Sequence, residues 1–246
     1  MGFLHPAQAQ IITTVAGDGS IHSFMIGEGG PATNAEIKPV SVVLDTVGNL
    51  YVVDGGNHRM IHKINISGII TLFAGTTYGG LISDGVPATA EELNPTDIAI
   101  DNIGNIYLTD KYSTTHGRVR KINTSGIITT VAGSATTTLV GDGGPATNAN
   151  LDDPEGIAVD WYGNIYITDL SGHRIRKVDA TGIISTIAGT GSPAYSGDGF
   201  AASAASINAP EGIFVDGTGN VYFCDKGNHR IRKIDASGII TTIAGT

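Results

Sequence analysis

The chain repeats one short motif at a near-constant interval. Each copy reads Gly-Asn, then an aliphatic residue, then Tyr, and the copies recur about every 56 to 59 residues. Self-similarity at such a period indicates one supersecondary unit repeated along the chain, so the pattern within a single copy predicts the fold. The four copies begin at Gly48, Gly104, Gly163 and Gly219.

Each copy contains four short strand signals. The first is a run of branched apolar residues that is too short for a helix, and an Asp-x-x-Gly-Asn turn joins it to a second strand containing the Tyr. The third alternates basic and apolar residues, and a turn ending in Ser-Gly or Thr-Gly leads to the fourth, which ends in Ala-Gly. Four antiparallel strands joined by tight turns predict one blade of an all-β β-propeller. The predicted repeats cover approximately residues 18–75, 76–133, 134–189 and 190–246.

The third strand is preceded by Asn-His-Arg in the first and last copies, at residues 57–59 and 228–230. With the strand pattern, this tripeptide resembles the NHL-repeat family over residues 11–246. The text Gly-Asp-Gly-Gly-Pro-Ala-Thr-Asn-Ala at residues 141–149 is similar to NHL arrays of secreted bacterial proteins and of the adhesion receptors called teneurins. The resemblance implies a propeller and favours six blades. Some members bind RNA on a basic face, and others are enzymes, including amidating lyases that hold zinc with histidines.

The N-terminal region carries an additional strand signal. Residues 11–17 are a fifth copy of the outermost strand, whereas the other three strands occur four times. The chain is therefore either a four-bladed ring with a redundant strand or an incomplete six-bladed ring. The extra strand either has no third-strand partner or competes with residues 239–244 for the strand at 230–234. An incomplete ring leaves blade edges open, which predicts self-association.

Residues 1–10 precede the repeats. The text Ala-Gln-Ala-Gln at residues 7–10 resembles the small-residue end of a secretory signal peptide, so we interpret residues 1–10 as a signal-peptide remnant or a linker. Export to the periplasm, the cell surface or the medium is the expected localisation. No run of about 18 apolar residues is present, so membrane insertion is not expected. A net charge of −9 opposes nucleic acid as a partner, because phosphate binding requires excess Lys and Arg.

Two sets of connections lie on one face of a propeller disc: the long loops that lead into each first strand, and the loops between second and third strands. We call this the loop face and predict that it binds a protein or a glycan. Three carboxylates that begin first strands could converge on a polar or cationic ligand, or hold channel water. Further candidates come from a lengthened loop and from an aromatic residue in the last long connection. The predicted ligand-binding residues are Asp97, Glu155 and Glu211, then Lys111, Tyr112 and His116, and Tyr195.

Two recurring polar positions invite a metal interpretation. An acid precedes glycine in every long loop, where it either caps a short helical turn starting at the following Pro or contributes to a cation site. A His recurs before the third strand, and because these histidines are spread around the ring, structural hydrogen bonds are favoured over a zinc site. We therefore predict no cofactor and no metal. The acids are Glu28, Asp84, Asp142 and Asp198, and the histidines are His58, His173 and His229, with His116 nearly equivalent.

The leading hypothesis is a non-catalytic, extracytoplasmic binding or scaffold module. One alternative is a propeller lyase or hydrolase with its site in the central channel, and another is a structural array within a larger surface protein. An enzyme needs unlike polar groups that converge in a pocket, whereas a binding module needs a broad face. The sequence does not identify the ligand.

Overall fold

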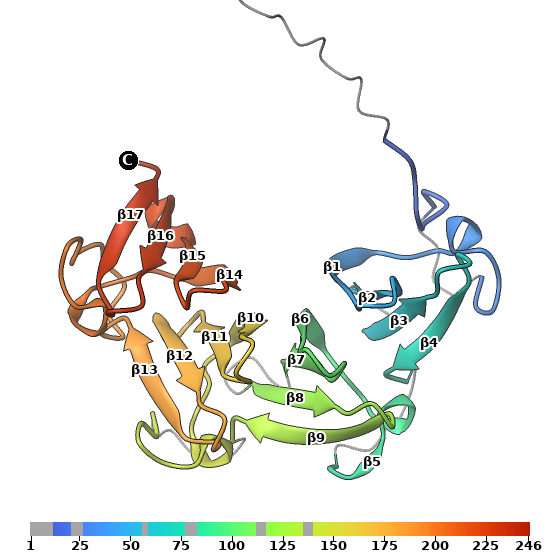
Figure 1. Ribbon diagram of the computed structural model, residues 1–246, viewed down its shortest axis with the longest axis horizontal. Helices are drawn as coiled ribbons and strands as arrows, with labels where there is room; N and C mark the ends of the chain where they lie inside the picture. The colour runs from blue at the N-terminus through green and yellow to red at the C-terminus, as the bar shows by residue number, and fades with distance from the viewer. Residues whose placement is uncertain (1–11, 21–26, 56–58, 77–82, 112–116, 135–139) are drawn as a thin grey trace, which may run out of the picture.

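The computed structural model describes residues 12–20, 27–55, 59–76, 83–111, 117–134 and 140–246. The strands in these residues form four antiparallel sheets, and the four main strands of each follow in sequence order from the inner to the outer strand, which confirms the all-β propeller prediction (Figure 1). We call the sheets blades 1 to 4. Blade 1 contains β1 (Pro39–Leu44), β2 (Leu50–Asp54), β3 (Met60–Ile64) and β4 (Ile70–Ala74). Blade 2 contains β6 (Pro95–Ile100), β7 (Ile106–Asp110), β8 (Arg118–Ile122) and β9 (Ile127–Ala132), with β5 (Val86–Pro87) added outside β9. Blade 3 contains β10 (Pro154–Val159), β11 (Ile165–Asp169), β12 (Arg174–Val178) and β13 (Ile184–Ala188). Blade 4 contains β14 (Pro210–Val215), β15 (Val221–Asp225), β16 (Arg230–Ile234) and β17 (Ile240–Ala244).

Helical structure in the described residues is limited to single 3₁₀ turns. The predicted turns after Pro31, Pro87 and Pro145 are confirmed, and the same turn follows Ala201 in blade 4. Another turn lies between β15 and β16. The turns are η1 (Ala32–Asn34), η2 (Ala88–Ala90), η3 (Ala146–Asn148), η4 (Ala202–Ala204) and η5 (Lys226–Asn228).

The turn between the first two strands of each blade is organised by its Asp. In blade 2, Asp101 accepts backbone N–H groups of Ile103 and Asn105, the Asn105 side-chain amide at 2.6 Å and the Tyr107 hydroxyl at 3.2 Å. The Lys121 ammonium lies 5.4 Å from the centre of the Tyr107 ring. Burial raises the pKa of Tyr107 to about 12, and the Asp101 charge adds to this shift. The carboxylate is therefore a structural hydrogen-bond acceptor. Blades 1, 3 and 4 repeat the arrangement with Asp45, Asp160 and Asp216.

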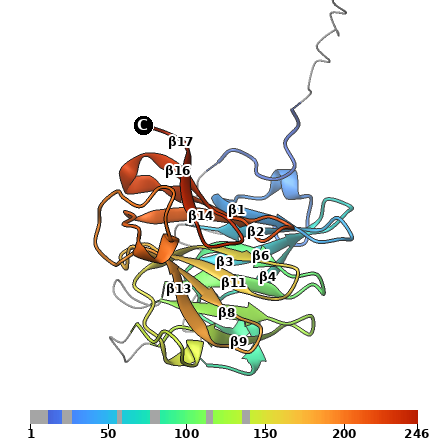
Figure 2. The same ribbon diagram turned by 60° about the vertical axis from the view of Figure 1, so that its left-hand side comes forward.

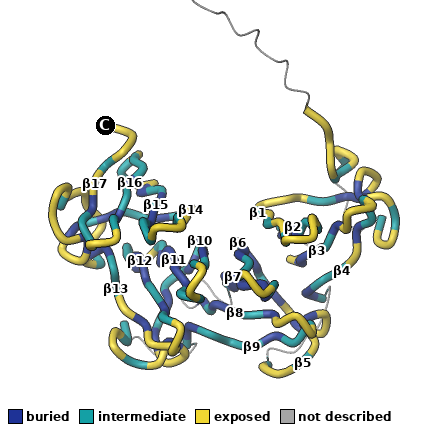
Figure 3. The backbone as a smooth tube through the Cα atoms, viewed as in Figure 1, coloured by how far each residue is buried: buried dark blue, intermediate teal, exposed yellow. Residues whose placement is uncertain are grey.

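The hydrophobic core lies between neighbouring blades. One cluster joins Tyr51 and Ile61 of blade 1 to Ile98 and Leu108 of blade 2, and similar clusters join blades 2 to 3 and 3 to 4. Buried residues accordingly concentrate in the strands, and the connecting loops are exposed (Figure 3). Each blade is therefore stabilised mainly by its neighbours, as expected for stacked repeats.

An arginine is completely buried in the third strand of blades 2, 3 and 4. In blade 3, Arg176 Nη2 lies 2.8 Å from Asp142 Oδ1 of the long loop, and Nη1 lies 3.7 Å from Asp169 Oδ2 at the end of β11. Burial raises the pKa of Asp169, and the Arg176 charge acts in the opposite direction. We call this set the arginine clasp. The equivalent residues are Arg120 with Asp84 and Asp110, and Arg232 with Asp198 and Asp225.

The clasp corrects the predicted role of the loop acids. The four turns that follow these acids have no side-chain cap, because Pro or Ala occupies the N-cap position. The acids instead reach a buried cation that lies 34 to 36 residues later in the chain. They hold the long loops against their blades. In blade 1, His62 replaces the arginine, with Nδ1 at 3.4 Å from Glu28 and Nε2 at 3.6 Å from Asp54.

The blades lie along an open arc. The inner strands contact one another in the order β1, β6, β10 and β14, so β1 and β14 are the two ends (Figure 1). Side chains at these ends are exposed where their equivalents are buried: Val42 is 56% exposed and Ile98 3%, while Phe214 is 62% exposed and Ala158 8%. The arc therefore presents an uncovered apolar surface on each end blade.

The outer edge of blade 4 is occupied by the C-terminal copy of the outermost strand. β17 pairs with β16, and the end of the chain lies on the outer side of this blade (Figures 1 and 2). Residues 12–16, which the sequence predicts as the fifth copy, are not in a strand. This confirms the alternative in which that copy has no third-strand partner in the described part of the chain.

The arginine clasp predicts a specific cost. Replacing Arg176 by Met leaves Asp169 buried without its cation, so we expect the free energy of unfolding to fall by about 3 to 5 kcal/mol. Arg174→Met is the control, because Arg174 lies two residues away on the same strand, donates to loop carbonyls and lowers the pKa of Asp169 less than Arg176 does, so its loss should cost about 1 kcal/mol or less. Denaturant unfolding of both variants measures the difference. Equal effects would contradict the clasp.

Candidate functional site

A lysine links blades 2 and 3 on the loop face. Lys111 directly follows β7, and its backbone N–H donates to the Asn94 carbonyl at 3.0 Å, which fixes the start of the loop. Its ammonium lies 2.9 Å from Asp153 Oδ1 and also contacts Glu155 at the beginning of β10. Burial lowers the pKa of Lys111, but the two carboxylates outweigh burial, and the net shift is upward. Two of the predicted ligand-binding residues, Lys111 and Glu155, are thus in contact.

A second lysine extends this arrangement in blade 4. Lys226, in η5, pairs with Glu211 at the start of β14. The pKa of Lys226 is raised by Glu211, and further by Glu155, while Lys111 lowers it, so the two ion pairs act on each other. Charges of opposite sign therefore alternate across three blades. We call Asp153, Lys111, Glu155, Lys226 and Glu211 the charged row.

Asp97 has a different environment from the two glutamates. Its carboxylate accepts the Ser41 hydroxyl of β1 and the backbone N–H of Ile157 in β10 at 2.9 Å, so it bridges blades 1 and 3. Burial raises the pKa of Asp97, and these hydrogen bonds act against the shift. Blades 3 and 4 have glycine here, and at Gly156 a Cβ would lie 2.4 Å from the Glu211 carbonyl oxygen. Among the described residues, no three His, Cys, Asp or Glu side chains are grouped as metal ligands.

The central channel lies between the four inner strands and has a volume of about 320 Å³. Its lining is mostly apolar, with side chains such as Val42, Ile98 and Phe214. Polar side chains in the lining are contributed by Ser41 and Asp97, which are hydrogen-bonded to each other. The channel therefore offers an apolar wall with one hydrogen-bonded carboxyl group.

Tyr195 anchors the last long loop. The Arg230 guanidinium stacks on its ring at 3.7 Å from the centroid, and its hydroxyl donates to Asp198 Oδ2 at 2.9 Å. Asp198 is the loop acid of the blade 4 clasp. The structure thus places Tyr195 beside β16, with its ring already occupied by a cation.

The histidine positions are only partly described. Tyr112, His116 and His58 lie outside the described residues. His173 Nδ1 accepts the backbone N–H of Ala209 at 3.1 Å, which links the blade 3 loop to the segment entering β14. Burial lowers the pKa of His173, and the neighbouring Arg174 charge adds to this effect. His229, the blade 4 equivalent, is exposed.

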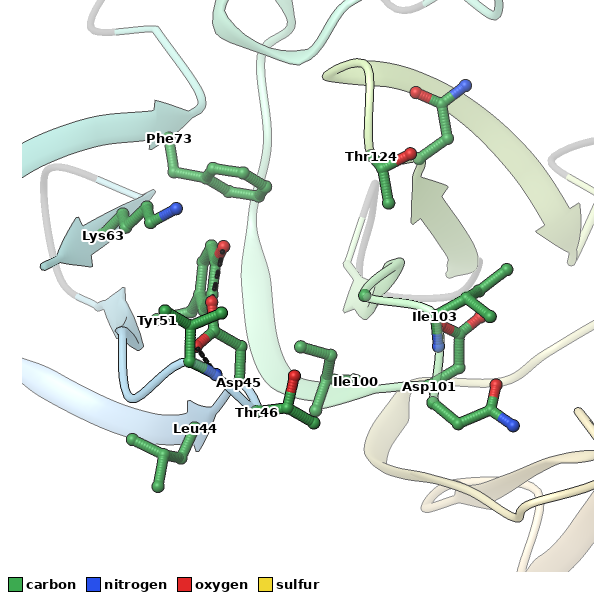
Figure 4. A pocket seen from close by; sticks show the side chains of 14 residues that line it. Leu44, Asp45, Thr46, Tyr51, Lys63, Phe73, Ile100, Asp101, Ile103 and Thr124 are labelled. Atoms are coloured by element: carbon green, nitrogen blue, oxygen red, sulfur yellow. Dashed lines mark hydrogen bonds between the residues drawn. The ribbon is translucent and has the colours of Figure 1, made fainter.

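A pocket that the sequence did not predict lies on the opposite side of the disc, with the turns between first and second strands and between third and fourth strands. We call this side the turn face. A cavity of about 350 Å³ opens here between blades 1 and 2 (Figure 4). The sequence feature that could have indicated this pocket is the presence of large apolar residues at the variable positions of the Asp-x-x-Gly-Asn turns. These residues are Val47, Ile103, Trp161 and Tyr162.

Comparisons with known proteins agree with the repeat pattern. A family model described as "Teneurin NHL domain" matches residues 136–196 and 191–246. Human Teneurin-4 is 32% identical over 235 residues, which is 85% of this chain and 8% of that protein. A structural genomics protein of unknown function from Bacteroides thetaiotaomicron is 30% identical, with a TM-score of 0.62 over 80% of this chain and 47% of that one.

A more distant structure shares the fold alone. Virginiamycin B lyase from Staphylococcus aureus is 20% identical, with a TM-score of 0.52 over 83% of this chain and 54% of the lyase chain. The chain thus spans a small fraction of the teneurin and about half of each matched structure. No helix in the described residues is long and apolar enough to cross a membrane.

His173 provides a test of the structural role of the loop histidines. His173→Ala leaves the Ala209 N–H without its acceptor, so the free energy of unfolding should fall by about 1 kcal/mol at neutral pH, and the exposed His229→Ala should change it less. Because the folded-state pKa lies below the ordinary 6.5, this contribution is present above pH 6.5 and is lost as the pH falls through the folded value. Unfolding curves between neutral and mildly acidic pH measure both effects. A contribution that grows on acidification would contradict the bond to Nδ1.

Proposed function

Because the chain belongs to the NHL-repeat β-propeller family, we propose that it is a non-catalytic module that recognises a protein or a glycan through its loop face, outside the cytoplasm. The similarity to the teneurin NHL domain supports a binding or scaffold role. The observation that carries the proposal is the charged row. It lies on one face and contains residues from three blades.

The charged row has the properties of a recognition surface. Its side chains are held by ion pairs, and Lys226 remains 62% exposed, so a partner can approach without unfolding a loop. Charges of alternating sign at the edge of an interface favour a partner with the complementary order and disfavour others. The arginine clasps hold the surrounding loops in blades 2, 3 and 4, which limits the ordering cost of binding.

Extracytoplasmic location is supported by the sequence. The small-residue sequence at residues 7–10 resembles the end of a signal peptide. The sequence similarity to Teneurin-4 extends over 85% of the chain. The same likeness is compatible with a scaffold role inside a larger surface protein, since the matched teneurin is much longer than this chain.

The alternative function is a lyase or hydrolase with its site in the central channel. It is suggested by the fold that the chain shares with virginiamycin B lyase. The channel of this chain contributes Asp97 and Ser41 within an apolar lining, and both already bond to neighbouring blades. An enzyme of this kind would use Asp97 as its acid or base while the Ile157 N–H and the Ser41 hydroxyl orient the carboxylate.

The binding proposal is tested by charge reversal on the loop face. We expect the double variant Lys111→Glu and Lys226→Glu to lose about tenfold or more in affinity for any ligand found on a panel of glycans and cell-surface ectodomains. Lys177→Glu is the matched control, because this lysine lies over the Tyr166 ring of its own blade and does not belong to the charged row. Surface plasmon resonance at two salt concentrations measures the effect.

Two results would count against a non-catalytic loop-face module. One is a ligand that the double variant binds as tightly as the native chain. The other is turnover: conversion of quinupristin, the compound bound by the related inactive lyase variant, would favour the channel enzyme. Circular dichroism of the variants confirms that the blades remain folded.

We also propose that the chain self-associates through the open ends of the arc. Val42 and Phe214 are exposed on opposite end blades, in positions where other blades bury their inner-strand residues. Faces that normally pack on a neighbouring blade favour pairing with another apolar surface. The second copy of the chain is then a partner in addition to the loop-face ligand.

Sedimentation tests this association. The native chain should form dimers or larger species at about tens of micromolar. The double variant Val42→Lys and Phe214→Lys should shift it toward monomer, because a charge on either end face opposes burial. Val47→Lys serves as the control, since this exposed valine is at a turn rather than an end face. A monomeric native chain would contradict the proposal.

A further inference from the structure

The pocket on the turn face is built from the facing sides of blades 1 and 2. Figure 4 shows Phe73, Lys63 and Tyr51 on one side and Ile103 and Thr124 on the other. The edge of the Phe73 ring meets the Tyr51 ring at a centroid distance of 4.8 Å and an interplanar angle of 77°. The blade 1 wall is therefore a packed aromatic pair. The other apolar lining residues are Leu44, Val47 and Ile100.

A local difference between blades accompanies this opening. Between blades 2 and 3, the Asn102 side-chain amide donates to the Trp161 carbonyl at 3.4 Å and ties the two turns together. In blade 1 the position equivalent to Asn102 is occupied by Thr46. Threonine has no side-chain amide, so it cannot make the same amide-to-carbonyl bond to the turn of blade 2. The turns of blades 1 and 2 can therefore stand apart at their tips.

The carboxylates at the pocket are already satisfied. Asp45 accepts the backbone N–H groups of Val47, Gly48 and Asn49, and the Asn49 side-chain amide at 2.7 Å. Its pKa is lowered because these hydrogen bonds outweigh desolvation. Asp101 is bound in the same way by its own turn. Asn123 also accepts backbone N–H groups of its own turn, so most acceptors in the lining are engaged. The apolar side chains of the wall lie beside Thr46, Asn102 and Thr124.

One cation lines the pocket. The Lys63 ammonium lies 5.3 Å from the centre of the Tyr51 ring, at the edge of the cavity. The side chain is held over the ring, and its ammonium group offers hydrogen-bond donors but no acceptor. A carboxylate on a ligand complements this charge where it binds at Lys63, whereas the negative charges of Asp45 and Asp101, which their hydrogen bonds do not remove, disfavour it elsewhere in the pocket.

The apolar surface continues beyond the pocket. Ile103 forms the blade 2 rim and is 71% exposed, and Trp161 on the next turn is 75% exposed. The hydrogen bond from Asn102 keeps the two turns adjacent. Exposed large side chains on neighbouring turns next to a cavity are typical of protein interaction sites.

We propose that the turn face binds a segment of a protein partner that inserts one leucine- or phenylalanine-sized side chain between blades 1 and 2 and pairs an adjacent carboxylate with Lys63. The volume of about 350 Å³ is at the lower end of ligand sites, which suits one large side chain and its flanking backbone. The rest of the segment lies over Ile103 and Trp161. This site is on the opposite face from the charged row and does not depend on the loop-face proposal.

The test uses short peptides and methyl NMR of the full chain. The probe is acetyl-Gly-Glu-Leu-Glu-Gly-amide, compared with the same peptide carrying serine instead of leucine and with one carrying glutamine instead of both glutamates. We expect the leucine peptide to shift the Ile100 and Ile103 methyl signals with a Kd of about 1 mM, and the serine peptide to leave them unchanged. The glutamine peptide should bind about threefold more weakly.

Matched variants locate the site. Ile103→Ser should weaken binding of the leucine peptide about fivefold or more, because it removes the apolar rim. Ile66→Ser is the control: Ile66 lies on a turn of the same face and is 72% exposed, against 71% for Ile103, but it does not line the pocket. Lys63→Gln should abolish the preference for the glutamate peptide over the glutamine peptide.

Several outcomes would overturn the proposal. The Ile100 and Ile103 methyl signals could remain unshifted at the solubility limit of the leucine peptide, or Ile103→Ser and Ile66→Ser could bind it equally well. Binding of maltohexaose at Trp161, with no response to the leucine peptide, would assign the turn face to a glycan instead. None of these results bears on Lys111 and Lys226, so failure here is distinguishable from failure of the loop-face proposal.

Discussion

The buried guanidinium of the third strand organises each of blades 2, 3 and 4. A cation that is removed from water requires carboxylates around it, and in blade 3 these come from the end of β11 and from the long loop, at Asp169 and Asp142. Asp169 in turn accepts the backbone N–H of Asp152, just before β10. One buried charge therefore fixes the inner strand, the second strand and the connection between blades. The pairing of the buried guanidinium with the loop acid therefore fixes the position of the long loop on the loop face.

Blade 1 shows how far the clasp can vary. His62 has a shorter side chain than arginine, and the opposing loop acid is Glu28, which has a longer side chain than Asp142. The two changes preserve the reach between the third strand and the loop. The contact between His62 and Glu28, at 3.4 Å, is longer than the contact between Arg176 and Asp142, at 2.8 Å, whereas the contact between His62 and Asp54, at 3.6 Å, is similar to that between Arg176 and Asp169, at 3.7 Å. Blade 1 is one of the two end blades, but the other end blade, blade 4, keeps its arginine clasp through Arg232, so the change to histidine is specific to blade 1.

The two faces of the disc use charge differently. On the turn face, Asp45 and its equivalents are saturated by their own turns, which leaves apolar residues and the stacked lysines for a partner. On the loop face, Lys111 and Glu155 belong to different blades, so their pairing depends on how the blades pack. The turn face is thus suited to an apolar segment and the loop face to a polar ligand. The two proposed surfaces lie on opposite faces, so the partners proposed for them would not compete for the same residues.

The fold followed from the sequence because it depends on local signals: the Asp-x-x-Gly-Asn turns, the short apolar runs and the Pro before three of the 3₁₀ turns act within a few residues. Contacts between distant residues could not be read in this way. The loop acids look like helix caps in the sequence, yet Asp142 reaches Arg176, which is distant in the chain. Asp97 is a bridge between blades 1 and 3, and the turn-face pocket exists because Thr46 and Phe73 face blade 2. The sequence by itself determined the blades and their turns. Only the tertiary structure decided which charges are buried, which are paired across blades and where a pocket opens, because packing between blades sets all three.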